Sequence, residues 1–174
     1  MTTEQLRTFI RDVPDFPKPG ILFKDITPLL RSSPALEAAC AMLAEPFRDQ
    51  AVTAVAGIES RGFIFGSIVA QNLGAGFVPI RKPGKLPWTT RRHEYILEYG
   101  SDALEIHDDA LTAEDRVLVI DDVLATGGTL AAAMQLVRGF EATLVGAATV
   151  IELGFLSGRE KLSTNAPVHS VLRY

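Results

Sequence analysis

The chain has 174 residues, of which 47% are hydrophobic and 22% are charged, and its formal net charge is −4. This length and composition predict one ordered globular domain with a complete hydrophobic core and argue against intrinsic disorder. The mildly negative charge argues against nucleic-acid binding, no apolar stretch is long enough to predict a membrane span, and the N-terminus shows no secretory signal pattern.

The N-terminal region predicts a helix followed by an irregular but ordered segment. Leu6, Phe9 and Ile10 recur at helical spacing within residues 3–11. Residues 15–28 (DFPKPGILFKDITP) contain prolines and a glycine that exclude a regular helix, and apolar residues that need packing partners. Irregular segments of this kind often carry binding specificity on a rigid sheet, although a covering loop without such a role is the alternative.

The next elements are a helix over 34–50 with Ser33 as its cap, a strand over 52–58 and a helix over 64–73. The single cysteine, Cys40, lies among apolar residues of the first helix. It is expected to be a buried residue of a protein from a reducing, cytoplasmic compartment.

A glycine-containing turn, GIESRGF at 57–63, joins this strand to the second helix. Such turns line the carboxyl edge of a parallel sheet, so the backbone N–H groups near Ser60 and Arg61 are expected to face a ligand. A surface pair between Glu59 and Arg61 at a helix start is the alternative interpretation.

A strand over 77–80 is followed by a long segment, 81–93, that begins with RKPGKLP. A basic loop rich in glycine and proline is typical of a mobile lid, and its closure would bring Arg81, Lys82 and Lys85 toward an anionic ligand. Solvated charges on an idle loop are the alternative. A strand over 94–100 follows, in which the alternation of side chains predicts that Glu98 faces solvent.

The most informative stretch is 117–129, VLVIDDVLATGGT. Its apolar start predicts a strand buried on both faces, with Asp121 and Asp122 where the strand should end. A small-residue turn over 125–129 then precedes a helix over 130–140, and free N–H groups at a helix start bind phosphate. Carboxylates accept hydrogen bonds from vicinal hydroxyls, so the acid pair beside a phosphate-binding turn predicts a ribose 5-phosphate site. The glycine spacing fits neither the dinucleotide-binding nor the Walker pattern. A helix cap beside two fortuitous acids is the alternative.

The remaining elements are a short strand and acidic turn over 102–114, a buried strand over 143–151 and a final edge strand over 168–172. The three histidines are dispersed without metal-ligand spacing, so no protein cage for a metal is expected.

These segments together resemble the adenine phosphoribosyltransferase family, within the type I phosphoribosyltransferases. The matching motifs occur in family order over nearly the whole chain: DFPKPGILFKDITP, GIESRGF, RKPGKLP, YILEYG, DDVLATGGT and GREKL. The resemblance implies an α/β fold, the type I phosphoribosyltransferase fold, in which helices flank a central, mostly parallel sheet. It implies a single domain over 1–174 with an N-terminal hood at about 12–30 and a flexible loop at about 81–93.

The resemblance also implies a reaction. The 5-phosphoribosyl group of phosphoribosyl diphosphate (PRPP) would pass to N9 of adenine, giving AMP and pyrophosphate in a purine-salvage step. Adenine and PRPP are the implied substrates, Mg²⁺ held mainly through PRPP is the implied cofactor, and a homodimer is the implied assembly.

Roles for individual residues follow from the same resemblance. Glu98 is implied as the acid/base group at N9, and Arg61 as the group that stabilises developing charge. The base is implied to contact hood residues and one residue after the 143–151 strand: Leu22, Phe23, Lys24 and Leu153. PRPP and AMP are implied to contact Asp121, Asp122, Ala125, Thr126, Gly127, Gly128, Thr129, Glu59, Ser60, Arg81, Lys82 and Lys85. The Glu59–Ser60 peptide bond is implied to be cis.

Two other functions stay open on the sequence. One is a 6-oxopurine phosphoribosyltransferase, although a backbone pair that matches the adenine amine would be mismatched with a 6-oxo group. The other is a PRPP-sensing regulator without catalysis, against which Arg61, Glu98 and the basic loop argue.

Overall fold

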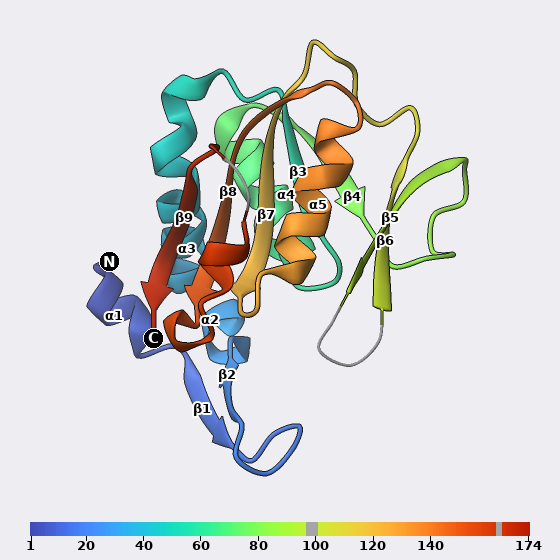
Figure 1. Cartoon of the computed structure of the whole chain (residues 1–174). Helices are drawn as coiled ribbons and strands as arrows, with labels where there is room; N and C mark the ends of the chain where they lie inside the picture. The colour runs from blue at the N-terminus through green and yellow to red at the C-terminus, as the bar shows by residue number, and fades with distance from the viewer. Residues whose placement is uncertain (97–100, 163–164) are drawn as a thin grey trace.

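The described part of the chain, residues 1–96, 101–162 and 165–174 of this computed structural model, folds around a five-stranded sheet (Figure 1). The strand order is β4 (Gly76–Ile80), β3 (Ala54–Ile58), β7 (Arg116–Leu124), β8 (Thr143–Glu152) and β9 (Val168–Arg173). Each neighbouring pair is parallel. The predicted α/β class with a parallel sheet is confirmed, and the last strand lies at an edge as expected.

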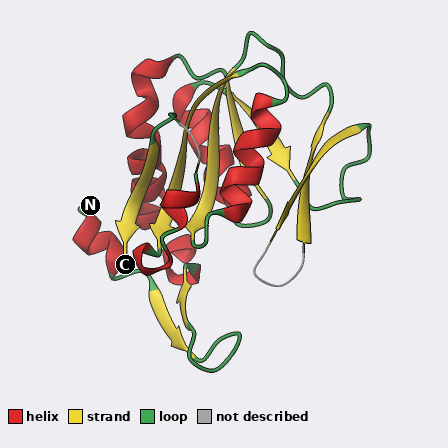
Figure 2. Cartoon of the chain, in the orientation of Figure 1, coloured by secondary structure: helices red, strands yellow, loops and turns green. Residues whose placement is uncertain are grey.

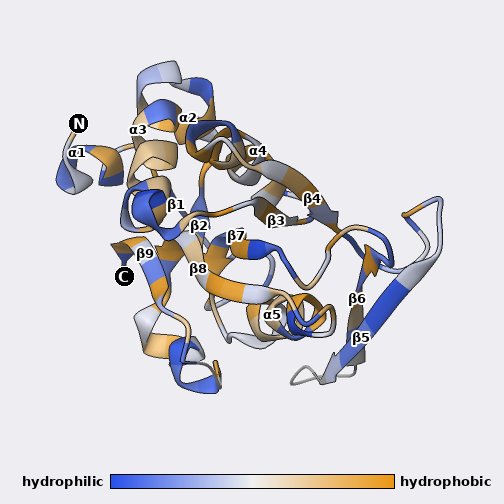
Figure 3. Cartoon of the chain, turned by 90° about the horizontal axis from the view of Figure 1, so that it is seen from above, coloured by the Kyte–Doolittle hydropathy of each residue, from blue (hydrophilic) through white to orange (hydrophobic). Residues whose placement is uncertain are grey.

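Helices cover both faces of this sheet (Figure 3). The helices on one face are α3 (Ser33–Ala44) and α4 (Gly62–Leu73), and α5 (Gly128–Arg138) lies on the other. Alternate residues of β7 belong to two separate cores, with Leu118 and Ile120 on the α3/α4 side and Val117 and Val119 on the α5 side. Burial on both faces explains why this strand is a continuous apolar run in the sequence.

Two antiparallel hairpins lie outside the sheet (Figure 2). One pairs β5 (Thr90–Ile96) with β6 (Ser101–His107), and backbone hydrogen bonds in both directions between Arg81 and Glu105 join it to the end of β4. The other pairs β1 (Arg11–Pro14) with β2 (Leu22–Asp25), between α1 (Thr3–Arg7) and α2 (Thr27–Arg31). It projects beyond the carboxyl ends of the central strands (Figure 1). Short 3₁₀ helices are η1 (Glu45–Gln50), η2 (Gly154–Leu156) and η3 (Gly158–Lys161).

The N-terminal region departs from the sequence prediction. The helix predicted over 3–11 ends at Arg7, and the segment 15–28, expected to be irregular throughout, contains β2 and the start of α2. Pro17 and Pro19 lie in the loop between β1 and β2, so they do not interrupt the ladder. The hairpin was missed because β1 (RDVP) is short and polar and gains its strand conformation only by pairing with β2.

The helix predicted over 34–50 also begins and ends at different residues in the structure. Ser32, not Ser33, caps α3, because its Oγ accepts a hydrogen bond from Ala35 N at 3.4 Å. The α-helix stops at Ala44 and the chain continues as η1, where Pro46 has no N–H to donate. Cys40 is buried in α3 as predicted, and burial raises the pKa of its thiol to about 12.

Two strands differ in extent from the prediction. β5 begins at Thr90, inside the segment expected to be a loop, because residues 90–96 pair with β6. β7 continues to Leu124, so Asp121 and Asp122 lie within the strand and not at its end. Residues 97–100 of the strand predicted over 94–100 lie outside the described residues. None of the helices in the described ranges is long and apolar enough to cross a membrane.

Candidate active site

A pocket of about 420 Å³ opens at the carboxyl ends of β3 and β7. It is bounded by the turn after β3, the end of β7 and the loop that leads into α5. The lining residues are Glu59, Ser60, Arg61, Lys82, Asp121, Asp122, Val123, Leu124, Ala125, Thr126, Gly127, Thr129 and Leu130. The two turns that the sequence predicted at one sheet edge therefore meet in one cavity. The Glu59–Ser60 peptide bond in the first of these turns is cis, as the resemblance implied.

The loop over 125–127 and the start of α5 lie side by side at the pocket. Gly127 precedes the helix with φ +85°, a conformation that favours glycine, and α5 begins without a side-chain cap among the described residues. A Cβ on Gly127 would lie 2.2 Å from the carbonyl oxygen of Gly158, so η3 packs directly against this loop. In the described part of the chain, the helix start thus presents N–H groups without an intrahelical partner and a positive dipole end beside the pocket.

The two acidic residues of β7 form the buried wall of the pocket. Asp121 and Asp122 are 8% and 5% exposed, and the amide of Asp122 donates to Asp121 Oδ1 at 2.8 Å. Burial raises the pKa of Asp121 well above its usual value, and the adjacent Asp122 carboxylate raises it further. Burial also raises the pKa of Asp122, although Arg61 opposes this shift through its Nε, 2.9 Å from Asp122 Oδ2. Donors such as ligand hydroxyl groups would stabilise the charged form of both side chains.

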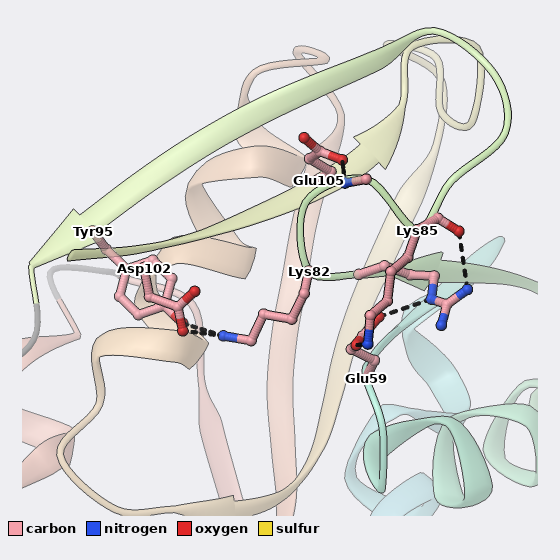
Figure 4. Close-up of polar contacts among 8 residues, drawn as sticks. Glu59, Lys82, Lys85, Tyr95, Asp102 and Glu105 are labelled. Carbon is pink, nitrogen blue, oxygen red and sulfur yellow. Dashed lines mark hydrogen bonds and ion pairs between the residues drawn. The ribbon is translucent and has the colours of Figure 1, made fainter.

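Glu59, at the pocket wall, binds two cations of the basic loop (Figure 4). Arg81 Nε lies 2.8 Å from Glu59 Oε2, and Lys85 Nζ lies 2.8 Å from Glu59 Oε1. Burial alone would raise the pKa of Glu59, but the hydrogen bonds from Lys85 and Arg81 outweigh it, so the pKa lies below its usual value. Gly84 N also donates to Glu105 Oε2 at 3.0 Å. The basic loop is therefore held by carboxylates from β6 and from the turn after β3.

The resemblance implies that Leu22, Phe23, Lys24 and Leu153 contact a base. None of these four described residues is among those that line this pocket. Phe23 comes near it, with its ring centre 5.5 Å from Arg61 Cζ and 5.2 Å from the ring of Phe16. Leu22 is exposed, and Leu153 packs at the edge of the α3/α4 core. Glu98 lies outside the described residues, so its position relative to the pocket is not described.

The Lys24 side chain, implied by the resemblance to contact the base, has two partners within the described chain. Its Nζ lies 2.6 Å from Asp12 Oδ1 and 4.0 Å from the centre of the Tyr174 ring. Arg7 lies over the same ring, with Cζ 4.4 Å from its centre. Lys24 therefore ties the β1–β2 hairpin to the end of β9.

Sequence reasoning missed several residues of the site. Val123, Leu124 and Leu130 line the pocket but read as ordinary core residues in the sequence. Tyr95 and Asp102 contact Lys82 from the β5–β6 hairpin. Tyr95 opens the YILEYG motif, but neither residue was given a role in the site from the sequence. Only the pairing of β5 with β6 brings these two side chains together.

Comparisons with known proteins agree with this arrangement. A family model described as the phosphoribosyl transferase domain matches residues 29–169. The chain is 56% identical over 171 residues to the adenine phosphoribosyltransferase of Nitrosococcus oceani, covering 98% of this chain and 99% of the relative. It is 58% identical over 157 residues to that of Acaryochloris marina, covering 90% and 92%.

Solved structures give the same result. The crystal structure of adenine phosphoribosyltransferase from Rhodothermus marinus superposes with a TM-score of 0.94 at 53% identity, covering 99% of this chain and 98% of that one. The Saccharomyces cerevisiae enzyme, complexed with an imino-altritol bisphosphate and adenine, superposes with a TM-score of 0.91 at 42% identity, covering 98% of both chains.

The buried acid pair yields a prediction about stability. A raised folded-state pKa means that Asp121 contributes most to stability below its usual value of 3.8 and that this contribution is lost as pH rises through the folded-state pKa. Asp121→Asn removes the buried charge but keeps an oxygen for the Asp122 amide. We expect the variant to be more stable than the parent by roughly 1 kcal/mol at about pH 7, with the gain shrinking toward about pH 4. Urea denaturation at both pH values measures the difference, and a gain of equal size at both would contradict this account.

Proposed function

The chain belongs to the adenine phosphoribosyltransferase family of phosphoribosyl transferase domain proteins, and from that premise we propose that it transfers the 5-phosphoribosyl group of PRPP to N9 of adenine, giving AMP and pyrophosphate. Its fold is the type I phosphoribosyltransferase fold. The observation that carries the proposal is the meeting, in one pocket, of a buried acid pair and the uncapped start of α5.

The loop and the acid pair suit the ribose 5-phosphate half of PRPP. Residues Ala125–Thr129 bind the 5′-phosphate, which accepts hydrogen bonds from backbone N–H groups and from the hydroxyls of Thr126 and Thr129. Asp121 and Asp122 accept hydrogen bonds from the two ribose hydroxyls. Both carboxylates are buried beside each other, so the ligand donors relieve their desolvation.

The opposite side of the pocket suits the pyrophosphate. Its oxygens bind the backbone near Ser60 and Arg61 and the basic side chains of Arg81, Lys82 and Lys85. For Arg81 and Lys85, the pyrophosphate competes with the Glu59 carboxylate that these two side chains contact. We propose that residues at about 81–93 act as the flexible loop that closes over this group.

In this proposal Mg²⁺ binds mainly through the oxygens of PRPP. Among the described residues, no group of three or more His, Cys, Asp or Glu side chains could hold a metal ion alone. The metal-ligand atoms that the pocket offers are carboxylate oxygens, a ligand type that Mg²⁺ prefers. They can complement an ion whose other ligands are PRPP oxygens and water. When bound, the ion supplies positive charge that offsets the charge of the departing pyrophosphate.

The adenine base fits between the N-terminal hairpin and the sheet edge. We propose that residues at about 12–30 act as a hood, in which the backbone near Leu22 pairs with the adenine amine and the neighbouring ring nitrogen. Phe23 covers the base and Leu153 forms a wall. Lys24 contributes to the base-binding stretch of the hood, and its side chain supports the hood through Tyr174. A 6-oxopurine would place an acceptor against the backbone acceptor, leaving both unpaired in a buried site.

The reaction makes the N9–C1′ bond and breaks the bond between C1′ and the pyrophosphate oxygen, and pyrophosphate departs with the electron pair. We propose that Glu98 takes the N9 proton, and that Arg61 stabilises charge that develops during transfer. A homodimer and a cytoplasmic location are proposed from the family resemblance.

The overall proposal is tested by pyrophosphate release from PRPP and Mg²⁺ in the presence of adenine, hypoxanthine, guanine, xanthine or orotate. We expect release with adenine alone, because the hood backbone matches its amine. Release with a 6-oxopurine alone would contradict the hood assignment. PRPP binding without release on any base would make the protein a PRPP-sensing regulator.

The phosphate loop is tested with a matched pair of glycine variants. Gly127 and Gly74 both have positive φ, but a Cβ on Gly74 meets nothing within 4 Å, whereas one on Gly127 meets Gly158. We expect Gly74→Ala to cost about 1 kcal/mol of stability with PRPP affinity unchanged. Gly127→Ala is expected to weaken PRPP binding by at least about tenfold, because the loop must move away from Gly158 and its N–H groups lose the position in which they face the phosphate. Calorimetric titration with PRPP and Mg²⁺ measures this, and equal PRPP affinities in the two variants would contradict the loop assignment.

The role of Glu98 is tested with Glu98→Gln, for which Glu94→Gln is the control. Glu94 is an exposed residue of β5 whose carboxylate pairs with Arg92. We expect Glu98→Gln to lower kcat by about a hundredfold with PRPP affinity retained, because the amide cannot take the N9 proton. Glu94→Gln should behave like the parent. Undiminished turnover in Glu98→Gln would remove this residue from the mechanism.

A further inference from the structure

Lys82 differs from Arg81 and Lys85, the other two cations of the RKPGKLP stretch at the start of the basic loop. Arg81 and Lys85 bind Glu59, whereas Lys82 lines the pocket and is held from the β5–β6 hairpin (Figure 4). Its Nζ forms an ion pair with Asp102 Oδ2 and lies 3.1 Å from the hydroxyl oxygen of Tyr95. The three groups form a closed cluster, because the Tyr95 hydroxyl also lies 3.1 Å from Asp102 Oδ2.

Tyr95 connects this cluster to the phosphate loop. Its hydroxyl oxygen lies 3.3 Å from Oγ1 of Thr129, a pocket residue in the first turn of α5. The Tyr95 side chain is buried in the core that α5 shares with the hairpin, so its hydroxyl has a fixed position. One hydroxyl group therefore touches both the cation on one side of the pocket and the loop on the other.

The geometry leaves Lys82 able to bind a ligand. An ammonium group has three N–H donors, and Asp102 and Tyr95 accept two of them. Burial alone would lower the pKa of Lys82, but the hydrogen bonds to Asp102 and Tyr95 outweigh this effect and raise it, so the side chain stays charged. Within residues 1–96, 101–162 and 165–174, Asp102 and Tyr95 are the hydrogen-bond partners of Lys82 Nζ, so its third N–H can reach an oxygen in the pocket that Lys82 lines.

We propose that Asp102 and Tyr95 are positioning residues for PRPP: they hold the Lys82 ammonium at the pocket rim and fix its place relative to Thr129. The inference rests on the proposed function, since it takes the ligand to be PRPP. Asp102 does not withdraw Lys82 from the site, because Lys82 lines the pocket while the ion pair is formed. A flexible lysine held in one place loses less conformational entropy when the pyrophosphate binds.

The test is calorimetric titration of PRPP and Mg²⁺ into Asp102→Asn and Tyr95→Phe, combined with steady-state kinetics. Asn keeps the oxygen that accepts from Ala103 N at 2.8 Å, and Phe keeps the buried ring. We expect the PRPP Kd and the KM for PRPP to rise roughly fivefold in Asp102→Asn and roughly threefold in Tyr95→Phe. The KM for adenine and the melting temperature should stay close to the parent values, which a general loss of structure would not allow.

Asp109→Asn is the control, because Asp109 is an exposed residue of the turn just after β6. It should bind PRPP as the parent does. The decisive comparison is a double-mutant cycle with Lys82→Met. If Asp102 acts through Lys82, Asp102→Asn should change the PRPP Kd little in the Lys82→Met background.

Each contrary result is distinguishable. An equal loss on Asp102→Asn with and without Lys82 would overturn the positioning role, as would tighter PRPP binding in the single variant. Unchanged PRPP binding in Asp102→Asn, with binding intact in the parent, would overturn the inference alone. Failure of the parent protein to bind PRPP would overturn the proposed function.

Discussion

The site depends on the burial of two adjacent carboxylates within the central strand of the sheet. Asp121 and Asp122 continue a strand whose apolar residues pack into two hydrophobic cores, so both carboxylates are largely removed from solvent. Arg61 offsets part of the resulting desolvation through Asp122, while Asp121 keeps its raised pKa. Such a pair is costly to the fold unless a ligand supplies donors, which is a frequent relation between stability and function at binding sites.

The cations around the pocket are already paired with carboxylates. Arg61 pairs with Asp122, Lys82 with Asp102, and Arg81 and Lys85 with Glu59. A simple anion would have to compete with these carboxylates and would gain little. A ligand with several phosphate groups, hydroxyl donors and its own divalent cation can replace many contacts at once. The charge arrangement therefore favours a large polyanion such as PRPP over an isolated phosphate.

C-terminal segments that are far from the site residues in the sequence pack against the elements that form the site. The carbonyl of Gly158 packs against Gly127, and Arg159 next to it forms an ion pair with the buried Glu152 at the end of β8. At the same end of the sheet, Gly154 N donates to Tyr174 O at 2.8 Å, and the Tyr174 ring contacts Lys24 of the N-terminal hairpin. The loop over 125–127 and the proposed hood are thus both supported by the C-terminal part of the chain.

The sequence by itself determined the parallel α/β sheet, the two turns at its carboxyl edge, and the acid pair with the small-residue loop that follows it. These features are local: burial on both faces produces continuous apolar strands, and glycine-rich turns at strand ends have their own residue chemistry. Only the tertiary structure decided that the N-terminal segment forms a hairpin and that Lys24 contacts Tyr174. It also decided that Glu59 binds cations 22 and 26 residues away, and that Asp102 and Tyr95 hold Lys82. Such contacts depend on how distant strands pair, and a local pattern in the sequence carries no information about the partner.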